Sequence, residues 1–132
     1  MTALELIISA LKLLGVLAEG ETPTAGESKD GLQALNGMLK SWKLEKRLAT
    51  DLATFTGYVL ADPMALGDGY ERAIRYNLAV ELAPEYGKAV SGEVYSIATK
   101  SIANIKKNNY TVTVKVAVDP ALLPETNWDI NA

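Results

Sequence analysis

The side chains that carry most protein chemistry are either missing from this sequence or poorly placed in it. The 132 residues include no histidine and no cysteine. Their absence removes imidazole bases, thiolate nucleophiles, disulfides and the usual zinc ligands. Carboxylates, lysines and hydroxyl groups remain as the candidates for catalysis or binding.

Glu81 and Glu85 have the four-residue spacing that would place two carboxylates on one face of a helix. Pro84 lies between them and breaks the helix that this geometry needs. A glycoside hydrolase needs two carboxylates facing each other across a cleft, and the sequence identifies no such pair. We therefore expect no catalytic residue, no metal ligand and no cofactor, with a cell-wall hydrolase kept as an alternative.

The segment Gly67-Asp68-Gly69 has the glycine content of a phosphate-binding loop. A Walker-type loop needs a lysine and a hydroxyl residue after its last glycine, whereas Tyr70 and Glu71 follow here. A dinucleotide-binding loop needs a preceding strand and a third glycine. The segment therefore predicts a turn that leads into a helix.

The densest basic cluster is a strip of four cations: Lys40, Lys43, Lys46 and Arg47. One interpretation is that they complement the negative end of a helix; the other is contact with a nucleic-acid backbone or an acidic partner. A second group has the same two interpretations: Lys100, Lys106 and Lys107. The formal charge of -3 and the pI near 5.0 argue against a protein that holds nucleic acid mainly by counterion release.

Four segments position these side chains, and each has the apolar periodicity of an amphipathic helix. They cover residues of about 3–14, 25–46, 69–83 and 92–108. Thr2 with Glu5 and Thr24 with Glu27 have the spacing of capping boxes, and Ser91 is a suitable N-cap. Gly31 and its neighbouring glycines lower helix propensity but permit close helix approach.

The third segment is expected to be the central helix and to end at Pro84. Its apolar face also contains one amide: Tyr70, Ala73, Ile74, Asn77, Leu78 and Leu82. Tyr70 and Trp42 are expected in the core. Residues 48–68 lose the helical period, and the β-prone run 55–60 predicts a loop with a short extended piece or a minimal hairpin.

The last part of the chain has a different pattern. Residues 110–118 alternate strictly and place four valines on one face: Val112, Val114, Val116 and Val118. Asp119-Pro120 ends this run, and large apolar residues follow: Leu122, Leu123, Trp128 and Ile130. We predict an all-α domain over residues 1–109, a small bundle of about four helices, and an extended strand-like arm over 110–132 that binds a partner.

The first helix resembles a signal peptide only superficially, because Glu5 and Lys12 interrupt its apolar run and no basic region precedes it. No segment reaches the ~20 continuous apolar residues of a membrane span. We expect a protein that is made in a cytoplasmic compartment and has no membrane partner.

Several stretches together resemble the head-to-tail adaptor, or packaged-DNA stabilisation, family of short-tailed phages. They are LKLLGV at Leu11–Val16, GLQALNGMLKSW at Gly31–Trp42, TGYVL at Thr56–Leu60, GYERAIRYNLAVELAPEYGK at Gly69–Lys88 and DPALL at Asp119–Leu123. They follow the family's order and span most of the chain. YNLAVELAPEYG is the most specific piece.

The resemblance implies a structural protein of the virion neck, assembled in the cytoplasm of a bacterial host. It implies a ring of about twelve identical subunits that docks on the portal protein through the C-terminal arm. Packaged DNA would pass through the ring without tight binding, and a downstream tail or nozzle protein would bind below. A small helical nucleic-acid-binding module that uses the basic strip is the alternative.

Overall fold

The computed structural model describes residues 1–67 and 69–109. This part of the chain contains four α-helices, a short 3-10 helix and no named strand, so the body is helical as predicted. The elements are α1 (Ala3–Leu13), α2 (Ala25–Lys43), α3 (Tyr70–Leu82), η1 (Pro84–Tyr86) and α4 (Gly92–Asn108).

The helices begin where the capping residues predict. Thr2 and Thr24 each form a complete capping box, in which the hydroxyl accepts from the amide of Glu5 or Glu27 and that glutamate accepts from the amide of the threonine. The Ser91 hydroxyl accepts from the Val94 amide at 3.1 Å. Helix α3 instead follows Gly69, whose φ of 88° is a left-handed conformation that favours glycine.

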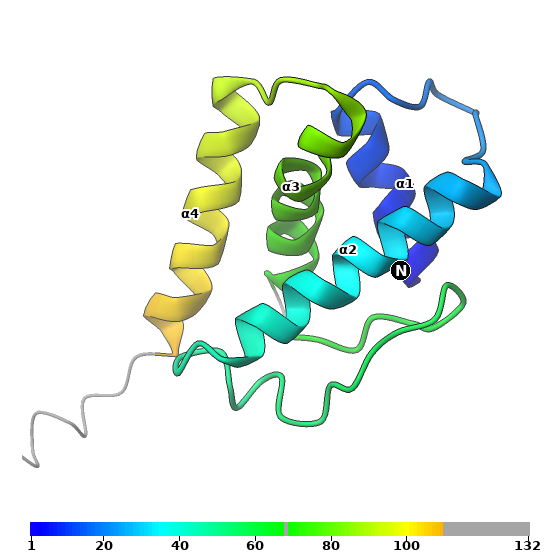
Figure 1. Ribbon diagram of the computed structural model, residues 1–132. Coiled ribbons are helices and arrows are strands. Elements are labelled where there is room, and N and C mark those ends of the chain that lie inside the picture. The colour runs from blue at the N-terminus through cyan, green and yellow to red at the C-terminus, as the bar shows by residue number, and fades with distance from the viewer. Residues whose placement is uncertain (68, 110–132) are drawn as a thin grey trace, which may run out of the picture.

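Helix α3 lies at the centre of the body and packs against each of the other three helices (Figure 1). Helix α1 packs against both α2 and α3, whereas α4 packs chiefly against α3. The largest fully buried side chains come from all parts of this core: Leu6, Ile7, Leu11, Leu35, Leu39, Leu48, Leu52, Tyr70, Ile74, Leu78 and Leu82. Tyr70 is therefore a core residue as predicted, whereas Trp42 is only half-buried.

Gly31 sets the distance between α1 and α2. A Cβ atom at this position would overlap the Cγ2 atom of Ile7, and it would lie 3.3 Å from the Cγ1 atom. Gly37 lies in the same helix with nothing within 4 Å of a built Cβ. Close helix approach is therefore confirmed for Gly31 and not for Gly37.

Helix α2 ends at Lys43, three residues before the predicted limit at 46. Leu48 lies nine residues after the buried Leu39, which would place it on the opposite face of a continued helix at about 100° per residue. The chain turns instead, and both Leu48 and Leu52 are fully buried. Lys46 and Arg47 consequently belong to this turn and not to the face of α2.

No named strand and no hairpin form in the described part of residues 48–68. Its one β-bridge joins Pro63 to Thr2. The carbonyls of Asp62 and Leu60 accept from the amides of Ala3 and Leu4, each at 3.0 Å. The loop thus satisfies amide groups of the first turn of α1, which have no partner within the helix.

Two side chains of α2 hold the middle of the same loop. The Asn36 side chain donates to the carbonyl of Tyr58 at 3.0 Å and accepts from the Tyr58 amide at 2.8 Å. The Lys43 ammonium donates to the carbonyl of Phe55 at 2.9 Å. The Phe55 ring is buried and lies 5.1 Å from the Tyr58 ring, so the loop packs as part of the core.

Candidate partner-binding surface

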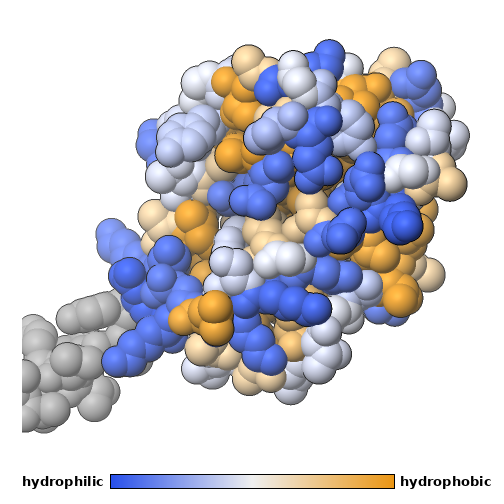
Figure 2. Space-filling view, in the orientation of Figure 1, coloured by the Kyte–Doolittle hydropathy of each residue, from blue (hydrophilic) through white to orange (hydrophobic). Residues whose placement is uncertain are grey.

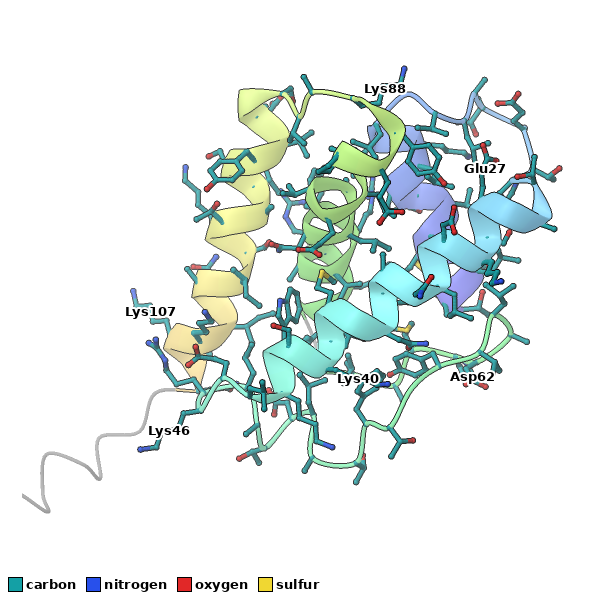
Figure 3. The ribbon with its side chains drawn as sticks, viewed as in Figure 1. Glu27, Lys40, Lys46, Asp62, Lys88 and Lys107 are labelled. Atoms are coloured by element: carbon teal, nitrogen blue, oxygen red, sulfur yellow. The ribbon has the colours of Figure 1, made fainter. Side chains whose placement is uncertain are left out.

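The C-terminal ends of α2 and α4 lie close together, at the point where the described chain ends at Asn109 (Figure 3). The loop after α2 brings Lys46 to the same place as Lys107. We call the C-terminal turns of α2 and α4, together with the turn after α2, the basic end. Its cations are Lys40, Lys43, Lys46, Arg47, Lys106 and Lys107, and Figure 3 shows Lys40 farther along the molecule than Lys46 and Lys107. The structure therefore joins the predicted strip to two of the three lysines of the second group.

One member of the predicted strip already has a structural role. The Lys43 ammonium is held against the Phe55 carbonyl, so its charge is partly used to fix the loop. Lys40 and Lys46 are exposed, and within the described residues neither forms a salt bridge. These two lysines are the members of the strip that are free to meet a partner.

Glu45 lies among these cations and joins α4 to the turn after α2. One carboxylate oxygen lies 3.6 Å from Arg47 Nε, and the other lies 3.7 Å from Lys106 Nζ. The Arg47 amide and the two nearby positive charges hold the pKa of Glu45 below its usual value. The carboxylate therefore stays ionised and offsets part of the positive charge of the basic end.

Asp51 ties three segments together at the root of the arm. One of its carboxylate oxygens accepts from the Tyr70 hydroxyl and from the Asn109 side-chain amide, each at 2.9 Å. The same Asn109 amide donates to the Arg47 carbonyl at 2.7 Å. Burial, and then the hydrogen bond and charge of Asp51, raise the pKa of Tyr70. Residue 109 therefore leaves the body at a defined position.

Sequence reasoning missed this network. Asn109 is the C-cap of α4, with a φ of -90° and a ψ of 0°. Its side chain bonds residues outside α4, and nothing in the sequence around it indicates these partners. Asp51 carries no local signal, because it follows a turn whose course depends on the burial of Leu48 and Leu52.

Leu44 lies between Lys43 and Glu45 at the end of α2, and 87% of its surface is exposed. It is the C-cap of α2, and the turn that buries Leu48 leaves it outside. Figure 2 shows apolar surface between hydrophilic side chains at this end of the molecule. The sequence contains one signal for this exposure: Leu44 does not lie on the apolar face of α2 that contains Leu35, Met38 and Leu39.

The charges of the basic end are less suited to phosphate than their number indicates. Two helices end here, and each contributes roughly half a negative charge from its free carbonyl groups. Phosphate groups bind preferentially at helix N-termini, which present amide hydrogens. A protein surface that supplies carboxylates and an apolar contact for Leu44 fits the arrangement better than a nucleic-acid backbone.

Lys100 lies two turns before Lys107, on the same face of α4. It lines a groove of about 340 Å³ between α3 and α4, together with Arg72, Ile97 and Asn104. The buried Ile105 also lines this groove.

The predicted arm, residues 110–132, lies outside the described residues. Its expected partner-binding residues therefore stay predictions: Val112, Val114, Val116, Val118, Leu122, Leu123, Trp128 and Ile130. Within residues 1–67 and 69–109, no group of three acidic, histidine or cysteine side chains could hold a metal ion. No helix in that part of the chain is long and apolar enough to cross a membrane.

No protein-family model matches the sequence. No curated protein matches it either.

Proposed function

We propose that this protein is a structural virion protein, the head-to-tail adaptor of a short-tailed phage. In this proposal about twelve copies form a ring beneath the portal, and the C-terminal arm of each copy binds the portal protein. The ring would retain packaged DNA and provide a platform for a tail or nozzle protein. The proposal assigns no catalysis and no cofactor.

The observation that carries the proposal is the way in which Asn109, the residue before the predicted arm, is held. Asn109 is held by two hydrogen bonds, to the Arg47 carbonyl and to Asp51, so the residues that follow start from a defined point. An arm with a fixed origin loses less freedom on binding than one that starts from a loose end.

The resemblance supports the same assignment through its most specific piece. YNLAVELAPEYG corresponds to the second half of α3 and to η1, and it contains both buried residues and surface residues. Asn77 in this piece donates to the carbonyls of Ala73 and Ala98, at 2.8 and 3.0 Å. That amide joins α3 to α4, and this role explains why a polar residue stands in an apolar stripe.

Native mass spectrometry of the chain mixed with its candidate portal protein tests the proposal. We expect a ring-sized complex with the portal, and we expect a truncation that ends at Asn109 to lose it. The truncation keeps every described helix, so circular dichroism would show whether the body is intact. A full-length chain that ignores the portal would contradict the proposal.

The alternative, a nucleic-acid-binding module, has one supporting observation. Lys40 and Lys46 are exposed cations without salt bridges in the described part of the chain. Duplex DNA affinity that falls steeply with salt and is lost on changing these lysines would favour it. Tight duplex binding would also contradict an adaptor ring through which DNA slides.

A further inference from the structure

Helix α2 separates two surfaces of opposite charge. Its first turns carry Glu27 and Asp30, and η1 brings Glu85 to the same place. We call these three carboxylates the acidic end. From Asp30 to Lys43 the helix rises by roughly 20 Å at 1.5 Å per residue. Figure 3 shows Glu27 and Lys46 at opposite ends of the molecule.

The acidic end surrounds a polar atom that has no partner. The Tyr86 hydroxyl is buried and forms no hydrogen bond within the described residues. Burial, and then the charges of Asp30, Glu27 and Glu85, raise the pKa of this hydroxyl.

Two lysines lie near the acidic end, and within the described residues neither forms a salt bridge with its carboxylates. Lys29 lies on another side of α2, because each residue turns the helix by about 100°. Lys88 extends outward from the top of the molecule, apart from Glu27 (Figure 3). In the described part of the chain, neither Asp30 nor Glu85 forms a salt bridge.

The helix dipole explains only part of this arrangement. Glu27 belongs to the capping box of α2, and Lys40 and Lys43 lie in its last turn. The effect of the dipole falls off within one turn of the helix end. The dipole of α2 therefore does not account for Asp30, Glu85 or Lys46. Lys107 lies in the last turn of α4, whose own dipole it complements.

We infer that the basic end of one copy, with the exposed Leu44 at the end of α2, binds the acidic end of the next copy. The occupant of each surface is thus a second copy of this chain. The charges are complementary, and the two surfaces lie at opposite ends of one helix. The inference rests on the proposed function, since it names the contact by which copies would form the ring.

The position of the two ends fits the geometry of a ring. A contact between two different surfaces of the same protein is head-to-tail, and it closes into a ring when each copy is rotated by a fixed angle. With about twelve copies that rotation is roughly 30°, so the two surfaces of one copy must face in nearly opposite directions. The ends of α2 meet this requirement.

Sedimentation velocity of the full-length chain, without any portal protein, tests the contact. We expect self-association above the 14.2 kDa monomer at low salt. High salt should abolish it, because the Debye length falls from about 30 Å at 0.01 M to about 3 Å at 1 M. A chain that stays monomeric at low salt would overturn the inference and would leave the portal-binding test of the proposed function unaffected.

Charge reversal identifies the surfaces. The triple variant Lys40→Glu, Lys46→Glu, Lys107→Glu should weaken self-association by about tenfold or more, and so should Asp30→Lys with Glu85→Lys. All five positions are exposed, so folding should not change. The control Lys29→Glu, Lys88→Glu, Lys100→Glu has the same net charge as the first variant but keeps Lys40, Lys46 and Lys107, so it should not weaken self-association.

Mixing the two defective variants gives the sharpest result. One variant has lost positive charge at its basic end, and the other has gained it at its acidic end, so each complements the other. An equimolar mixture should recover association that neither variant shows alone. A mixture that stays monomeric, or a control that dissociates as the first variant does, would overturn the assignment of these two surfaces.

Discussion

Helices α1 and α4 both pack against the central α3, but the fraction of buried residues is much larger in α1 than in α4. Five of the eleven residues of α1 are buried, and all five are apolar: Ala3, Leu6, Ile7, Ala10 and Leu11. Three of the seventeen residues of α4 are buried, and only Ile105 is a large one. A larger share of α1 than of α4 is therefore buried in the core, and most residues of α4 are at least partly exposed.

The contacts of α4 are also of another kind. Asn77 on α3 donates to the carbonyl of Ala98, and the Asn109 amide binds Asp51 and the Arg47 carbonyl. Hydrogen bonds of this type contribute about 1 kcal/mol each. They orient α4 and the root of the arm, while the apolar side chains around α1 provide most of the free energy of folding.

The largest expected effect comes from truncating α1. Leu11→Ala removes a fully buried side chain and should lower the free energy of unfolding by about 2–5 kcal/mol. The matched change in α4, Ile97→Ala, affects a half-buried residue of the groove and should cost about 1 kcal/mol or less. Urea denaturation of both variants measures the difference. Equal losses would break the comparison between the two helices.

The next largest effect is expected from two glycines of α2, whose replacement by alanine should change the stability of the protein in opposite directions. Gly31→Ala would push a methyl group into Ile7, whose β-branched side chain is stiff, and should destabilise the protein by about 1–3 kcal/mol. Gly37→Ala meets open space and should stabilise the helix by up to ~1 kcal/mol. Thermal unfolding compares them. A neutral Gly31→Ala would mean that α1 can move away from α2 at little cost.

The smallest expected effect on the free energy of unfolding concerns the hydrogen bonds near the end of α4, and it depends on pH. Tyr70→Phe removes the hydroxyl that donates to Asp51 and should cost about 1 kcal/mol near neutral pH. The pKa of Tyr70 is raised in the folded state, so its contribution is complete below the unfolded pKa near 10 and is lost as pH rises towards the folded value. The wild type should therefore lose stability at alkaline pH more steeply than the variant.

Urea denaturation at several pH values above 8 checks this difference in slope. A residual slope should remain in the variant, because burial also raises the pKa of Tyr58 and Tyr86. Identical slopes in the two proteins would show that the Tyr70 hydroxyl does not couple α3 to the root of the arm.

Local signals in the sequence were sufficient to predict the helices and the burial of Tyr70. The two threonine capping boxes, Ser91 and Pro84 each act within a few residues of the chain, so their effect is legible without the tertiary structure. The burial of Tyr70 was likewise predicted from the apolar stripe of α3. The prediction that Gly31 permits close helix approach was also confirmed.

The predictions that were wrong concern segments whose course depends on the burial of residues farther along the chain. The apolar period of the sequence predicted a helix to about residue 46. Helix α2 ends at Lys43 instead, because the chain turns there and buries Leu48. The β-prone run 55–60 found its partners in Asn36 and in the start of α1, not in a second strand. Secondary-structure propensity is a weak preference that tertiary contacts of this kind override.

By itself, the sequence determined which segments become helices, where they begin, and that the basic residues gather near the end of α2. Capping, periodicity and turn chemistry are properties of neighbouring residues, and they act in the same way in any fold. Only the tertiary structure decided that Asp51 holds Tyr70 and Asn109, that Leu44 stands exposed among lysines, and that opposite charges occupy the two ends of α2. Those arrangements join residues far apart in the chain, and the burial of the core brings them together.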